Sequence, residues 1–108
     1  MTSIDGVDFT EAPGEVEGSP YWVDLWGCVN GYRIGMQVKP DSFHSASVSV
    51  YQGKAKPGMR KGHDKFESDY GGKVFTTNLT HGEPPEYMVR AISEEIVRLR
   101  NLPSGDHC

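Results

Sequence analysis

The chain has 108 residues, of which 36% are hydrophobic and 10% aromatic, a composition that favours one small globular domain. No apolar run approaches the roughly 20 residues that a membrane-spanning helix needs, which predicts no membrane contact. The first residues lack the basic and apolar regions of a secretion signal, so we expect a cytoplasmic protein.

The net charge of -4 is distributed unevenly along the chain. Residues 1–20 contain five acids and no base, whereas residues 21–82 contain eight bases and five acids. The first segment has few apolar residues and is rich in Gly, Pro and acid, which predicts a flexible acidic leader over residues 1–19. The basic surplus that follows is compatible with a nucleic-acid partner.

Two alternating runs on either side of Asn30-Gly31 predict a β-hairpin, because this dipeptide tolerates the positive φ of a type I′ turn. A two-residue loop pairs Leu25 with Met36 and Asp24 with Gln37. Alternation then predicts an apolar face made of Val23, Leu25, Ile34, Met36 and Val38. The opposite face is expected to carry Trp22, Asp24, Trp26, Arg33, Gln37 and Lys39.

The rest of the chain alternates between strand and helix patterns. Residues 43–51 read as a third extended strand, although a helix is also possible. A basic loop over 54–62, a short helix over 63–72 that Gly71 caps, and a strand over 73–81 follow. After Pro84-Pro85 the apolar spacing predicts a helix over 86–102 that ends at Pro103.

We therefore predict a mixed α/β (α+β) domain over residues 20–103, followed by a tail over 104–108. Its small mixed β-sheet has a central hairpin, a short helix and a long C-terminal helix. The helix over 63–72 is placed to connect two parallel strands.

The cysteines and histidines suggest no structural bridge or zinc site. Cys28 lies in a predicted strand and Cys108 at the last position, and neither a disulfide framework nor a metal-binding spacing results. The four histidines are scattered at no zinc-ligand spacing.

Asp24, Gln37 and Lys39 form a polar group inside the predicted hairpin. The carboxylate of Asp24 and the amide oxygen of Gln37 are hard donors of the kind that Mg²⁺ accepts, and the backbone carbonyl of Val38 is a natural additional ligand. Lys39 is placed to orient a water or stabilise phosphate charge. The alternative is a solvated hairpin face on which Asp24 and Lys39 pair diagonally.

Asp24 followed by Gln37-Val38-Lys39 resembles the D…(D/E/Q)-x-K signature of the PD-(D/E)XK nuclease superfamily. The phrases "GYRIGMQVKPDSF" and "HDKFESDYGGKVFTTN" resemble the catalytic halves of type II restriction endonucleases. The resemblance covers roughly residues 20 to 80.

The resemblance implies a restriction-endonuclease-like fold that hydrolyses phosphodiester bonds of double-stranded DNA. It assigns Mg²⁺ (or Mn²⁺) binding to Asp24 and Gln37 and the catalytic lysine role to Lys39. Glu15 or Glu17 is available for a further glutamate that the family's first helix often brings. Two sites are often needed to cut both strands, so a homodimer fits this prediction.

Several basic side chains near the Gly/Pro-containing loop are candidate DNA contacts, with surface solubility as the alternative. They are Lys54, Lys56, Arg60, Lys61, His63 and Lys65. Trp22 and Trp26 can stack on bases or pack beneath a helix, and packing is the favoured interpretation. The rival function is a non-catalytic or truncated nuclease-like module that binds DNA or another protein.

Overall fold

Five strands form a single sheet in a computed structural model of the chain, which describes residues 2–18, 20–39, 57–78 and 83–108. The strands are β1 (Thr2–Ile4), β2 (Val7–Glu11), β3 (Leu25–Val29), β4 (Tyr32–Lys39) and β5 (Gly71–Asn78). The described helices are α1 (Gly14–Glu17), α3 (Pro57–Tyr70) and α4 (Glu86–Arg100). The predicted mixed α+β domain is therefore confirmed.

The strand order in the sheet follows the chain, β1-β2-β3-β4-β5. The first four strands run antiparallel to their neighbours, whereas β4 and β5 are parallel. Helix α3 precedes β5 and packs on it, as expected for a connection between parallel strands. The strand predicted over 43–51 lies outside the described residues.

The turn between β3 and β4 has the predicted geometry. Asn30 has φ 52° and Gly31 has φ 83°, the left-handed values that a type I′ turn requires. The strand pairing follows the predicted register, with Val29 opposite Tyr32 and Leu25 opposite Met36. The Asn-Gly dipeptide thus correctly fixed which residues of the hairpin face each other.

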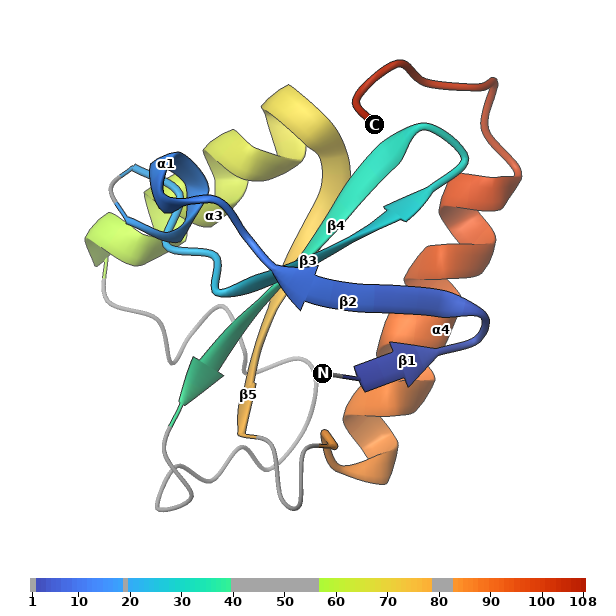
Figure 1. The fold of residues 1–108 in the computed structure, drawn as a ribbon, viewed down its shortest axis with the longest axis horizontal. Coiled ribbons are helices and arrows are strands. Elements are labelled where there is room, and N and C mark those ends of the chain that lie inside the picture. Colours follow the sequence, from blue (N-terminus) through green and yellow to red (C-terminus); the bar gives the residue numbers. More distant parts are fainter. Residues whose placement is uncertain (1, 19, 40–56, 79–82) are drawn as a thin grey trace.

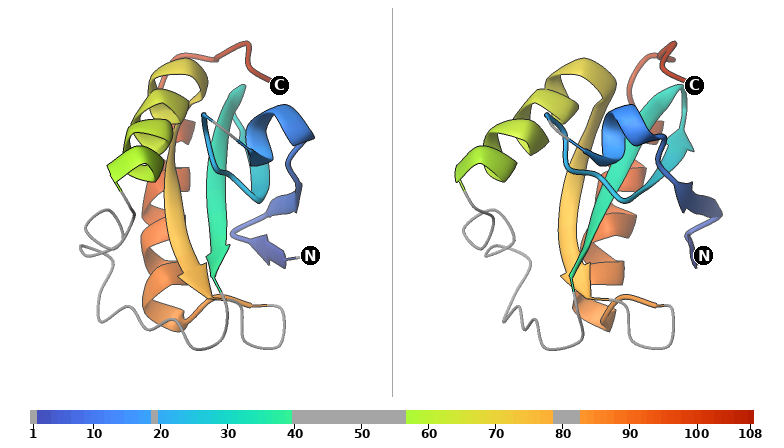
Figure 2. Two further views of the ribbon diagram at one scale, coloured as in Figure 1. Left: turned by 90° about the vertical axis from the view of Figure 1, so that its left-hand side faces the viewer. Right: turned by 60° about the vertical axis from the view of Figure 1, so that its left-hand side comes forward.

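Helices cover both faces of the sheet (Figure 1). On the α4 side, Ile34 and Met36 are fully buried against Ile92 and Ile96. On the α3 side, a smaller cluster forms from Ala12, Val16, Val23, Phe66 and Val74. The two further views show the sheet lying between α3 and α4 (Figure 2). The result is a three-layer arrangement of helix, sheet and helix.

The flexible leader expected over residues 1–19 was wrong, because most of it is part of the fold. Strands β1 and β2 form a second hairpin whose turn residues, Asp5 and Gly6, have φ 50° and 81°. Ile4, Val7 and Phe9 are buried in the α4-side core. The acidic composition concealed this alternation of buried apolar and exposed polar positions.

Helix α3 begins earlier than predicted. It starts at Pro57, so most of the predicted basic loop over 54–62 is helical, whereas residues 54–56 lie outside the described residues. Proline at the first helical position is favourable, because its missing N–H would have no partner there. The helix ends before Gly71, which has φ 95° and caps it as predicted.

The end of α4 is fastened to the β3–β4 turn. The side-chain amide of Asn30 donates to the carbonyl oxygens of Leu99 at 2.9 Å and Leu102 at 2.8 Å. The Leu99 carbonyl also accepts from the Leu102 N–H at 3.2 Å, so Asn30 adds side-chain hydrogen bonds to the C-terminal turn of α4. The helix ends at Arg100, close to the predicted limit.

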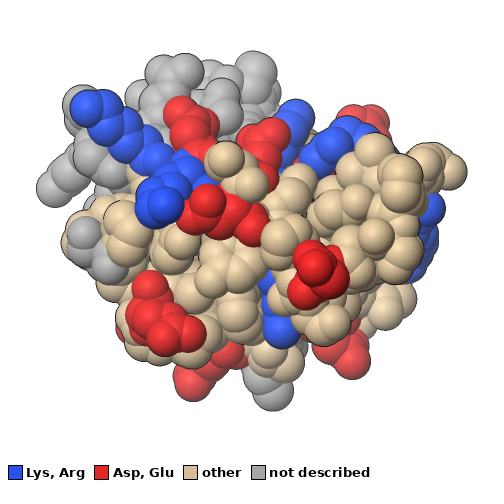
Figure 3. Space-filling model, turned by 90° about the horizontal axis from the view of Figure 1, so that it is seen from above, with Lys and Arg blue, Asp and Glu red and all other residues tan. Residues whose placement is uncertain are grey.

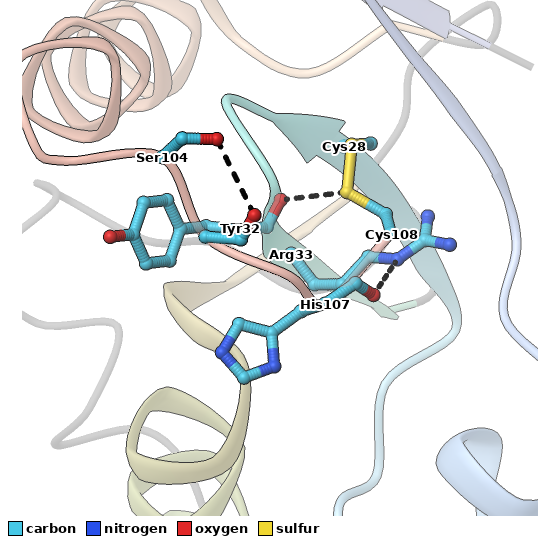
Figure 4. The surroundings of a disulfide bond; sticks show 7 residues. Cys28, Tyr32, Arg33, Ser104, His107 and Cys108 are labelled. Atoms are coloured by element: carbon cyan, nitrogen blue, oxygen red, sulfur yellow. Dashed lines mark hydrogen bonds between the residues drawn. A yellow bond between two sulfur atoms is a disulfide. The ribbon is translucent and has the colours of Figure 1, made fainter.

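The predicted tail over 104–108 crosses the same turn. The N–H of Gly105 donates to the Asn30 carbonyl at 2.9 Å, and that of His107 to the Gly31 carbonyl at 2.7 Å. Cys108 then forms a disulfide with Cys28 of β3 (Figure 4). The expectation that these cysteines form no bridge was therefore wrong, because a separation of 80 residues in sequence conceals their proximity.

We predict that Cys108→Ser lowers the free energy of unfolding by about 2–4 kcal/mol, because the bridge closes a long loop in the unfolded chain. Urea denaturation under non-reducing conditions measures this. Wild-type protein treated with dithiothreitol should unfold at the same urea concentration as the variant. Equal stability of oxidised wild type and the variant would contradict the prediction.

We predict that Gly62→Ala destabilises the packing of α3. A Cβ atom at this position would lie 1.8 Å from the backbone oxygen of Pro20, so the helix or the segment before β3 must shift. Overpacking of this kind costs about 1–3 kcal/mol. Gly14→Ala is the matched control, because a Cβ there meets nothing within 4 Å. Equal melting temperatures of the two variants would refute the explanation.

Candidate functional site

Asp24 connects three segments at the start of β3. Its backbone N–H donates to the Met36 carbonyl at 2.9 Å, and its own carbonyl accepts from Ala12 at 2.9 Å. Its carboxylate oxygen Oδ2 accepts from the backbone N–H of Val38 at 2.7 Å. The half-buried side chain therefore takes the place of a backbone partner for β4.

The chain turns sharply just before Asp24. Trp22 has φ 60°, a left-handed value that is uncommon for a bulky residue. Val23 consequently packs in the α3-side cluster rather than with Leu25, and the predicted apolar face is wrong at this residue. The alternation rule fails here because Val23 lies outside the regular strand, which begins at Leu25.

The three other predicted site residues are consecutive at the end of β4. Gln37 is 6% exposed and pairs with Thr76 of β5, Val38 is half-buried and pairs with Thr77, and Lys39 pairs with Asn78. Asp24 was expected directly opposite Gln37, but the regular pairing ends at Leu25 and Met36, just before Asp24. Asp24 contacts β4 on either side of Gln37, through its backbone N–H at Met36 and its carboxylate at Val38.

The carbonyl of Val38 points to the same edge of β4 as the carboxylate of Asp24. This follows because the N–H and C=O of one strand residue point in the same direction, and the Val38 N–H donates to Asp24. A carboxylate and a backbone carbonyl, both hard oxygen ligands, thus lie on the edge of β4 that faces the segment leading into β3. This is the donor chemistry that Mg²⁺ or Mn²⁺ accepts.

Asp24 provides a single carboxylate to this set. Within the described ranges, no group of three or more His, Cys, Asp or Glu side chains is arranged to hold a metal ion. Glu15 and Glu17, the candidate further acids, are exposed on the single-turn helix α1. Asp24, the Gln37 amide and the Val38 carbonyl would need water and phosphate oxygens to complete the coordination of Mg²⁺.

A buried hydroxyl next to Gln37 was not predicted from the sequence. Thr76 is 0% exposed, and its Oγ1 has no hydrogen-bond partner. Burying such a group costs about 1–3 kcal/mol. The Phe-Thr-Thr run reads as an ordinary strand, so only the pairing of β4 with β5 reveals where this hydroxyl lies.

The predicted DNA contacts have different environments. Lys54 and Lys56 lie outside the described residues, and Arg60 lies in the first turns of α3. Lys61 is exposed on α3, and Lys65 forms an ion pair with Asp69 at 2.9 Å. An exposed pair of this kind contributes little stability and leaves the lysine available.

His63 does not lie where a DNA contact requires it. Its ring is 4% exposed, and its Nε2 lies 3.3 Å from the Trp22 carbonyl oxygen. The ring thus packs between α3 and the segment before β3. The prediction that it contacts nucleic acid was wrong, because a buried imidazole cannot reach a phosphate.

Trp26 packs beneath a helix, as the favoured interpretation expected. Its ring meets Tyr70 of α3 edge-on with centroids 5.7 Å apart. The guanidinium of Arg33 lies 3.9 Å from the Trp26 ring centroid, and burial lowers the pKa of Arg33. This ring is therefore half-buried against the α3-side cluster, with Arg33 and Tyr70 in contact with it.

Acidic and basic side chains are interspersed on the end of the molecule that carries the C-terminal tail. Figure 3 shows blue and red residues alternating there, so the described residues in this view form no continuous basic surface. A surface hollow of about 430 Å³ is lined by Asp64, Glu67, Ser68, Gly71 and Arg98. The hollow lies at Gly71, where β5 begins. Asp24 lies near the end of β4, which pairs with the opposite end of β5 at Asn78, so the hollow is not the Asp24 site.

Comparisons with protein-family models, curated proteins and solved structures found no match to this chain. Within the described ranges, no helix has the length and apolar content to cross a membrane.

Tyr21 anchors the segment before Asp24 to α3. Its hydroxyl donates to the Asp69 carboxylate at 2.6 Å, and this bond, with burial, raises the pKa of Tyr21 from 10.0 to about 12. The same bond lowers the pKa of Asp69. The raised tyrosine pKa means that its stabilising contribution is complete below pH 10 and is lost as the pH rises through about 12.

We predict that one of the five tyrosines ionises near pH 12 rather than pH 10. Titration of tyrosinate absorbance measures this, and Tyr21→Phe should remove the late step. The stability advantage of wild type over the variant should disappear over the same alkaline range. A late step that persists in the variant would assign the shift to another tyrosine.

Proposed function

We propose that this protein is a metal-dependent DNA endonuclease of restriction-enzyme type. The observation that carries the proposal is the bond from the Val38 N–H to the Asp24 carboxylate. It holds the carboxylate beside the Gln37-Val38-Lys39 segment, which is the grouping that the PD-(D/E)XK signature requires. The order of hairpin, helix α3 and parallel strand β5 is also the order that the resemblance implies.

The donor set fits a hard divalent cation. Asp24 provides a negative charge, and Gln37 and the Val38 carbonyl provide neutral oxygens. When bound, Mg²⁺ or Mn²⁺ polarises the phosphodiester and lowers the pKa of a water ligand. Few protein charges hold the cation, so phosphate oxygens of the DNA are expected to contribute strongly to its affinity.

Lys39 supplies the second chemical function. It follows Val38 at the end of β4, and its proposed role, which the resemblance implies, is to orient the attacking water and stabilise charge on the phosphate. Asp24 orients the segment by its bond to Val38. Lys61, Arg60 and Lys65 of α3 are proposed to contact the DNA backbone without reading sequence.

The proposal extends to assembly and location. Two sites are often needed to cut both strands of a duplex, and a homodimer would supply them. Activity on DNA in the cytoplasm would also expose the Cys28–Cys108 pair to reducing conditions, in which we expect two thiols.

The rival function is a non-catalytic or truncated module that binds DNA or another protein. The lack of a three-residue acidic or His-containing cluster among the described residues favours it. Such a module would bind DNA with a salt-sensitive affinity that is indifferent to Mg²⁺ and to the charge of Asp24.

We predict that purified protein nicks or cuts supercoiled DNA with Mg²⁺ or Mn²⁺, and that Asp24→Asn abolishes this activity. Asparagine keeps an oxygen that can accept from the Val38 N–H, so the fold is retained while the charge is lost. Lys39→Ala should slow cleavage about 10²–10⁴-fold. Lys73→Ala is the charge-matched control. Lys73 lies near the start of β5, whereas Lys39 pairs with Asn78 at the other end of this strand.

Agarose gels and circular dichroism on the same preparations separate loss of chemistry from loss of fold. Cleavage that persists in folded Asp24→Asn and Lys39→Ala would contradict the mechanism. Metal-independent DNA binding without cleavage by wild type would support the rival module.

A further inference from the structure

Thr76 is a buried polar residue that the proposed chemistry does not yet use. It lies in β5, is 0% exposed, and its hydroxyl oxygen has no hydrogen-bond partner. Buried hydroxyls in native proteins are rarely left in this state, and such exceptions are often associated with function. A neighbouring polar side chain is therefore expected to form a hydrogen bond with this hydroxyl when the protein is active.

The pairing of β4 with β5 identifies that neighbour. Gln37 is the Cα partner of Thr76 in the parallel ladder, and laterally paired residues project to the same face of a sheet. The Gln37 side chain is also buried, at 6% exposure. Val74, two residues before Thr76, packs in the α3-side cluster, so both side chains lie on the α3 side.

A glutamine ligand has an orientation problem that a carboxylate does not have. Its side chain ends in one acceptor oxygen and one donor nitrogen, and only the oxygen can bind a cation. A rotation of the amide would direct the NH₂ group at the metal. A fixed acceptor for the NH₂ group prevents this, and the threonine hydroxyl oxygen is such an acceptor.

We propose that Thr76 is a positioning residue for Gln37, an inference that rests on the proposed nuclease function. In the metal- and DNA-bound protein, Thr76 Oγ1 accepts a hydrogen bond from Gln37 Nε2, which directs Gln37 Oε1 toward the cation. Outer partners of metal ligands act in this way, and their loss typically lowers metal affinity 10- to 100-fold.

The test uses Thr76→Val, which removes the hydroxyl with little change of shape, and Thr76→Ser, which retains it. DNA cleavage is measured against Mg²⁺ concentration at saturating DNA. We expect Thr76→Val to raise the half-saturating Mg²⁺ concentration about 10-fold or more, with most of the maximal rate recovered at high Mg²⁺. Thr76→Ser should retain the wild-type Mg²⁺ requirement.

Two controls separate positioning from general damage. Thr77→Val alters the next residue, which is 1% exposed and projects to the opposite face, so it should leave the Mg²⁺ requirement unchanged. Thermal denaturation should show Thr76→Val to be at least as stable as wild type, because the lost hydroxyl had no partner.

Binding of Mn²⁺ without DNA, followed by electron paramagnetic resonance, distinguishes a failure of the Thr76 role from a failure of the proposed function. Wild type that cuts DNA, together with an unchanged metal requirement in Thr76→Val, would overturn the role of Thr76 alone. Wild type that neither binds Mn²⁺ nor cuts DNA would overturn the proposed function and this role with it.

Discussion

The type I′ turn at Asn30-Gly31 is the constraint on which most of the structure depends. It sets the register of β3 and β4, and it also receives the end of α4 and the tail. Gly31 is required for more than its φ of 83°, because a Cβ there would lie 2.1 Å from the Gly105 oxygen. One dipeptide therefore determines both the pairing of the central strands and the position of the last helix.

The same register determines where the candidate site lies. Once Leu25 pairs with Met36, Asp24 falls beside the end of β4, and its carboxylate replaces a strand partner for Val38. The bond orients the carboxylate but also occupies one lone pair of Oδ2. A carboxylate has about four lone-pair positions, so three remain for a cation and water. Structural and catalytic use of Asp24 are thus compatible.

The sequence was sufficient for the parts of the fold that depend on local signals. The Asn-Gly turn, the apolar period of α4, and Gly71 at the end of α3 were each predictable from a few adjacent residues. The predictions failed where distant contacts decide the outcome. Cys28 and Cys108 meet only because α4 returns the chain to the hairpin, and Val23 changes face because Trp22 adopts a positive φ.

Composition was the least reliable guide. The acidic first segment looked disordered when its residues were counted, yet Ile4, Val7 and Phe9 alternate correctly for an edge hairpin. For the candidate site, residue types and spacing predicted a group of Asp24, Gln37 and Lys39, and the structure shows Asp24 bonded to Val38, which lies between the other two in sequence. Residue types and spacing could not reveal that Thr76 lies beside Gln37, because this depends on which strand pairs with β4.

The Cys28–Cys108 bridge makes the chain from β3 to the last residue a covalent ring. A single backbone cut within residues 40–56 would open this ring without separating the two pieces. Val38 and Thr76 would then belong to different polypeptides that remain joined through sulfur, so a nicked and a continuous molecule would differ in mass only by the water that the cut adds. Reduction would leave the pieces joined only by non-covalent contacts such as the pairing of β4 with β5. Continuity of the backbone and integrity of the site are therefore separable properties of this molecule.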